Sequence, residues 1–195
     1  MNMKKISLIC LGCIFSLVFF NNCKKAPDCI MEPAHFVLYT NSFKDTISFK
    51  YSCGSSQQFH PQLWWSGMGG NPDGNPPPGS FVMIMDDPDA IPVAGYIWNH
   101  WVLYDIPGNV SEIEEGVDRL GVFPAIVKRG INSFGDTTYG GPCPPPGSAH
   151  RYRFKLYAMK NAELGIGRAA TVAQIRMAMG SNILDSAEMT AVFKR

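Results

Sequence analysis

Residues 150–159 read His-Arg-Tyr-Arg-Phe-Lys-Leu-Tyr-Ala-Met. From Arg151 to Leu156, basic residues alternate with aromatic or apolar ones. A strand turns successive side chains to opposite faces, so this period of two predicts a strand with one buried and one solvent-facing side. The stretch therefore favours a sheet that packs on a core through one face.

A second stretch predicts the centre of that sheet. Residues 81–85 are continuously apolar and are followed by Asp86, as expected of a strand covered on both faces. Further strands are expected at residues 36–39, 45–51, 96–106 and 188–193. One helix is expected over residues 172–179, with Thr171 as its N-cap and Gly180 at its end.

Composition limits the fold class. The chain has 195 residues, 46% of them hydrophobic and 17% charged, which suffices for one globular domain with a core. Its 19 glycines and 15 prolines argue against long helices. The 17 basic residues against 16 acidic ones leave no surplus for a nucleic-acid partner. We expect a mainly β domain of two packed sheets, without intrinsic disorder.

The first residues are typical of an export signal. Lys4 and Lys5 precede an uncharged, mostly apolar run at residues 6–20, which is short for a bilayer span. We assign residues 1–22 to a signal segment, 23–35 to a linker and 36–195 to the folded domain. Cys23 is a candidate lipidation site, so lipoprotein processing, ordinary cleavage and a retained anchor all stay open. The expected location is the periplasm or the membrane surface as an anchored lipoprotein.

Export to an oxidising compartment also makes a disulfide plausible. The candidates are Cys29, Cys53 and Cys143. Three thiols cannot all pair, and the sequence does not choose between the pairs.

Titratable residues recur where predicted strands meet loops. Asp87 and Asp89 follow the buried strand, His100 lies in the aromatic strand, and His150 opens the strand after a Pro-rich loop. Strand ends beside loops are where a rigid scaffold presents functional groups. Asp-Pro-Asp is also a common turn sequence, and a lone strand histidine is often a core residue, so these residues matter only if they converge in space.

The same residues carry a resemblance. Four segments carry it, namely Asp87-Pro88-Asp89-Ala90, His100-Trp101-Val102, the Gly/Pro-rich residues 139–147 and His150-Arg151-Tyr152. In their order and spacing, these segments resemble the phosphatidylethanolamine-binding protein family, which includes the Raf kinase inhibitor proteins. The resemblance runs from about residue 36 to the end. It implies one large antiparallel sheet packed on a smaller one, peripheral helices, and a small cavity for phosphate-like anions such as a phospholipid head group.

The resemblance also implies the site residues. They are Asp87, Asp89, His100, His150 and Tyr152, with Gly141, Pro142 and Cys143 as one wall. His60 stands where the family commonly has a small residue, and we expect it as a further polar group near the mouth. We expect the carboxylates to orient the histidines and to raise their pKa, so that the imidazoles donate to an anion and affinity falls above about pH 6.5.

Three classes of function follow. The first is an exported binding protein for a phosphate-bearing small molecule or lipid head group, in contact with the membrane only through its signal or lipid anchor. The second is an inhibitor of a partner enzyme, such as a kinase or protease, through protein contact. The third is a weak hydrolase, which we do not expect, because only Cys143 is available as a nucleophile and no base accompanies it. No cofactor and no metal are expected.

Overall fold

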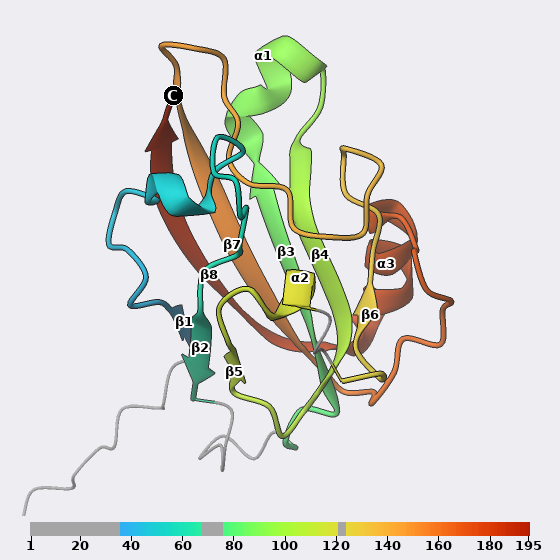
Figure 1. Cartoon of the computed structure of the whole chain (residues 1–195). Coiled ribbons are helices and arrows are strands. Elements are labelled where there is room, and N and C mark those ends of the chain that lie inside the picture. Colours follow the sequence, from blue (N-terminus) through green and yellow to red (C-terminus); the bar gives the residue numbers. More distant parts are fainter. Residues whose placement is uncertain (1–35, 68–75, 121–123) are drawn as a thin grey trace, which may run out of the picture. The chain divides into compact units, whose positions relative to one another are not determined.

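Two antiparallel sheets build the part of the chain that the computed structural model describes, which is residues 36–67, 76–120 and 124–195 (Figure 1). The larger sheet has the order β6 (Lys128–Arg129), β4 (Trp98–Pro107), β3 (Ser80–Asp87), β7 (Ala149–Met159) and β8 (Ile183–Lys194). The smaller sheet has the order β1 (Val37–Tyr39), β2 (Leu63–Ser66) and β5 (Glu112–Ile113). In the described part of the chain, three short α-helices accompany them, namely α1 (Ile91–Ala94), α2 (Val117–Leu120) and α3 (Val172–Met179). The expected β class and the large-on-small arrangement of sheets are confirmed.

The central strands follow the predicted patterns. All of β3 is buried, and it pairs with β4 on one side and β7 on the other. In β7, Tyr152, Phe154 and Leu156 are buried, whereas Arg151 is exposed and Arg153 and Lys155 are half-buried. The continuous apolar run and the alternating run therefore each took the position in the sheet that its hydrophobic pattern predicts.

Each face of the large sheet carries a core. The inner core lies between the sheets and joins Leu63 and Trp65 of β2 to Met83 and Met85 of β3. The outer core joins the opposite face of β3 to α3, which packs through Ile175 and Met179. Because β3 is covered on both sides, it is a rigid base for the residues at its ends.

The helix α3 begins and ends as predicted. The Thr171 hydroxyl accepts from the Gln174 amide at 3.3 Å, and the Gln174 side chain accepts from the Thr171 amide at 2.8 Å. This reciprocal capping box satisfies two amides that the first turn leaves unpaired. Gly180 closes the helix with φ of 42°, in the left-handed half that glycine tolerates.

Three local expectations need correction. Residues 45–51 form no regular strand: Thr46 makes a single parallel bridge to Val192, and Phe49–Tyr51 is a 3-10 helix. The alternating pattern was misleading because Phe49 points to solvent and is 64% exposed. A strand at β2 was not foreseen, and the closing strand β8 begins at Ile183, five residues before the predicted start.

Several predictions about the termini concern residues that are not described. The signal segment 1–22, the linker 23–35, Cys23 and Cys29 all lie outside the described residues. Within the described ranges, no helix combines the length and apolar character needed to cross a bilayer.

Candidate functional site

Three central strands meet at one end of the large sheet, where the predicted polar residues gather. Strand β3 ends there at Asp87, while β4 and β7 start there near His100 and His150. A β-bulge decides which way His100 faces: Met85 pairs with Trp101 and Asp86 with Asn99, so His100 is an extra residue in β4. It therefore lies on the inner face, where its ring meets the Tyr152 ring edge-on at a centroid distance of 5.1 Å.

Asp87 holds His150. The Asp87 carboxylate oxygen Oδ2 lies 2.7 Å from Nδ1 of His150, and Oδ1 accepts from the Ala90 amide at 3.1 Å. Both residues are buried. A carboxylate only accepts, so Nδ1 of His150 carries the hydrogen, and Nε2 is the ring nitrogen left for a ligand. Asp87 thus orients a histidine and also holds the loop backbone at Ala90.

His100 is held differently from the expectation. Its Nδ1 lies 2.8 Å from the Gly140 carbonyl oxygen and contacts no carboxylate. Since a carbonyl also only accepts, this nitrogen is the donor, and in the neutral ring Nε2 carries no hydrogen. Burial lowers the pKa of His100, against the weaker opposing effects of the Gly140 carbonyl and Asp87. The nearby carboxylate thus acts in the expected direction, but burial outweighs it, and the expected net rise in the pKa is wrong for this histidine.

The two histidines open on one cavity of about 280 Å³. Four of the predicted residues line it: Asp87, His100, Cys143 and His150. The rest of the wall is mostly apolar and includes Val93 of α1, Trp98 of β4, Phe134, Pro144 and Pro145. The convergence on which the sequence argument depended is therefore present.

Asp89 does not line the cavity. It accepts from the Arg151 guanidinium at 2.6 and 3.0 Å and from the Arg151 amide at 2.9 Å. These bonds hold the pKa of the Asp89 carboxyl at about 2. We had expected Asp89 to orient a histidine, and it instead ties the loop after β3 to the start of β7.

Three further predicted site residues, Tyr152, Gly141 and Pro142, are not among the residues that line this cavity. Tyr152 is fully buried, and burial together with nearby Asp87 raises the pKa of its phenol. Gly141 packs so closely on another segment that a Cβ there would lie 2.5 Å from the Tyr51 carbonyl oxygen. The Pro142 carbonyl accepts from the Cys53 amide at 3.1 Å.

A disulfide fixes the same wall. Cys53 and Cys143 are bonded, with their Cα atoms 5.4 Å apart and a sequence separation of 90. Of the three pairs left open by the sequence, the structure thus has the one that ties the cavity wall to the segment after the 3-10 helix.

His60 is a core residue and not a polar group at the mouth. It is fully buried, its ring stacks on that of Trp101 at 4.4 Å, and its Nε2 accepts from the Asp118 amide at 3.2 Å. Burial lowers the pKa of His60 as well. Its role is to join the loop before β2 to α2.

Two residues that bring polar groups to the cavity, Arg195 and Trp98, escaped the sequence reasoning. Arg195 reaches it because β8 pairs with β7 from Ala149 opposite Lys194, which brings residue 195 beside Ser148. Its guanidinium donates to the Cys143 sulfur at 3.5 Å. Trp98 places an indole N–H that is buried and finds no acceptor among the described residues. No local sequence pattern marks either residue as part of a site, since single arginines and strand tryptophans are common.

The comparisons with known proteins agree with this architecture. The sequence model of the family described as "Phosphatidylethanolamine-binding protein" matches residues 40–194. The chain belongs to the phosphatidylethanolamine-binding protein family. The resemblance that the motifs suggested is thereby confirmed.

Relatives of this family member come from several microbes. A UPF0098 protein of Aquifex aeolicus is 37% identical over 161 residues, covering 81% of this chain and 88% of that protein. The crystal structure of Escherichia coli YbcL, described as a new member of the mammalian PEBP family, has a TM-score of 0.73 at 28% identity and covers 83% of this chain and 99% of its own. The putative PEBP homolog CT736 of Chlamydia trachomatis has a TM-score of 0.70 at 28% identity with the same coverage.

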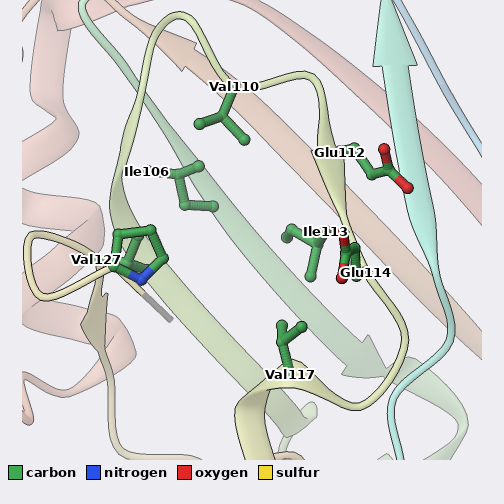
Figure 2. Close-up of a pocket in the computed structure, with 8 residues that line it drawn as sticks. Ile106, Val110, Glu112, Ile113, Glu114, Val117 and Val127 are labelled. Carbon is green, nitrogen blue, oxygen red and sulfur yellow. The ribbon is translucent and has the colours of Figure 1, made fainter. Parts of the chain in front are cut away.

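A larger pocket of this family member is chemically different. It measures about 370 Å³ and is lined by apolar residues with two carboxylates, Glu112 and Glu114. Figure 2 shows Ile106, Ile113 and Val117 turned toward a common space. A wall of hydrocarbon and carboxylates offers no donor to an anion, so the histidine cavity is the better candidate site. Within the described ranges, no three His, Cys, Asp or Glu side chains are grouped to hold a metal ion.

Proposed function

We propose that this protein is a binding protein that takes the phosphoryl group of a small molecule or lipid head group into the histidine cavity. The observation that carries the proposal is the convergence of His100 and His150 on one cavity, each with Nδ1 fixed and Nε2 left for a ligand. Imidazoles held in this way are ready to bind phosphoryl oxygens without first losing side-chain freedom.

The cavity also suits binding more than catalysis. The thiol that the sequence offered as a nucleophile, Cys143, is bonded to Cys53. The pocket is small, its wall is largely apolar, and its fixed polar groups are few, as is usual for a ligand site. The family name points to the same ligand chemistry, because phosphatidylethanolamine carries a phosphoryl group in its head.

Titration calorimetry with inorganic phosphate tests the proposal. We expect His100→Ala and His150→Ala each to weaken binding about tenfold or more, since each removes a hydrogen-bonding partner of a charged ligand. Lys160→Ala is the control, because Lys160 is exposed and follows the opposite end of β7. Wild-type affinity in the double histidine variant, or no phosphate binding by the wild type, would exclude this function.

We also infer that the protein acts outside the cytoplasm. Its support is the signal-like sequence of residues 1–22 together with the Cys53–Cys143 disulfide, which persists in oxidising compartments. Mass spectrometry of the protein from fractionated cells checks this: a full-length, reduced chain in the cytoplasmic fraction would contradict it.

A further inference from the structure

The charges around the histidine cavity do not by themselves favour an anion. Asp87 and Asp89 bring two carboxylates to this end of the sheet. Arg151 neutralises Asp89, at contacts of 2.6–3.0 Å. Asp87 remains on the wall, and burial lowers the pKa of the neighbouring His100, which favours its neutral form. Without a further cation, a phosphoryl group would meet the Asp87 carboxylate beside the His100 and His150 imidazoles.

Arg195 supplies that cation. Among the described residues it is the only Lys or Arg that lines this cavity. Within the described residues, the Arg195 guanidinium makes one side-chain hydrogen bond, the weak bond to the Cys143 sulfur, and most of its donors are therefore left for a ligand. Two backbone hydrogen bonds hold Arg195 in place. Its amide donates to the Ser148 carbonyl at 3.2 Å, and the Gly147 amide donates to the Arg195 carbonyl at 2.9 Å.

His100 imposes a second requirement on the ligand. With its Nδ1 hydrogen given to the Gly140 carbonyl, the neutral ring can only accept at Nε2. A ligand oxygen at this nitrogen must therefore carry a hydrogen. A phosphate monoester has such a P–OH group in its singly protonated form, with a pKa near 6, and inorganic phosphate keeps at least one P–OH group at neutral pH, whereas a phosphodiester has none.

We propose that Arg195 and the fixed tautomer of His100 make this cavity selective for a terminal phosphoryl group over a phosphodiester. Arg195 takes the negative charge of the ligand, and Nε2 of His100 accepts from its P–OH group. The inference rests on the proposed phosphoryl-binding function and narrows it to phosphomonoesters and inorganic phosphate. The head group within an intact phospholipid, which is a diester, would then be a poor ligand.

Methyl phosphate and dimethyl phosphate are matched probes, because they differ by one methyl group on the oxygen that would carry the hydrogen. At pH 6, a good part of methyl phosphate carries that hydrogen. In titration calorimetry we expect the wild type to bind methyl phosphate at least tenfold more tightly than dimethyl phosphate. Equal affinities for the two probes would overturn the selectivity.

Arg195→Gln tests the cation. We expect it to weaken methyl phosphate binding about tenfold or more, as the loss of a charge-assisted hydrogen bond to phosphate does. Arg176→Gln on α3 is the control for net charge, since Arg176 is exposed and does not line the cavity. Unchanged binding in Arg195→Gln, or equal weakening in both variants, would overturn the role of Arg195.

The two proposals fail in different ways. If methyl phosphate binds to the wild type and is lost in His150→Ala, the phosphoryl site stands, whatever Arg195→Gln and dimethyl phosphate show. If neither probe binds to the wild type, both the site and its selectivity are excluded.

Discussion

Replacing both Cys53 and Cys143 by serine should cost this protein much of its stability. The disulfide closes a loop between residues 90 apart, and it limits the freedom of the unfolded chain. In the chain-entropy account, a loop of this length corresponds to about 4.5 kcal/mol of unfolding free energy at 25 °C. With a urea slope of about 2 kcal/mol per M, the unfolding midpoint should fall by roughly 2 M.

Urea unfolding followed by tryptophan fluorescence measures this loss. The control is the wild-type protein unfolded in a reducing agent, which should unfold at the same midpoint as the double serine variant. A loss below about 1 kcal/mol in both samples would refute the reasoning, because it would show that the bond does not restrict the unfolded chain.

Two further predictions concern the wall and the histidines. Gly141→Ala should destabilise the fold by roughly 1–3 kcal/mol in urea unfolding, because a Cβ would lie 2.5 Å from the Tyr51 carbonyl oxygen. Gly167→Ala is the control: no atom lies within 4 Å of its Cβ, so the free energy of unfolding should change by less than about 0.5 kcal/mol. Equal effects of the two substitutions would contradict this. Burial lowers the pKa of His60 and His100, so as the pH falls these histidines take up protons in the unfolded chain before they do so in the folded one. The free energy of unfolding should therefore decrease below about pH 6.5, by at most about 1.4 kcal/mol per pH unit for each histidine. Unfolding free energies that agree at pH 7.5 and 5.5 would show that these rings are not protected from protons.

Local sequence patterns correctly predicted the strands and the helix in which hydrophobic period or capping residues determine the structure. The continuous run of β3, the alternation in β7 and the capped helix α3 each have a hydrophobic period or an end signal that tertiary contacts support. The segment at residues 45–51 shows the limit. Its period of two is real, but the Tyr139 hydroxyl, 88 residues away, donates to the Tyr51 carbonyl and helps to hold a 3-10 turn instead.

The candidate site was predictable only where a motif marks it. Asp87, His100 and His150 stand in recognisable local sequences, and the cavity contains all three. Their partners were less accessible to sequence reasoning. That His100 binds a carbonyl, and that Asp89 pairs with Arg151, depends on side-chain directions that spacing does not reveal. Arg195 arrives through strand pairing over 45 residues, which no local pattern encodes.

The bulge in β4 places a constraint on how this sheet can vary over evolution. Because His100 is the surplus residue opposite Met85 and Asp86, deleting Asn99 would pair His100 with Asp86, restore even pairing and leave a well-formed ladder. The imidazole would then rotate to the helix-covered side, beyond the reach of Tyr152. A homologue that keeps every residue of the motif but loses this one-residue offset would inherit the scaffold without its binding chemistry.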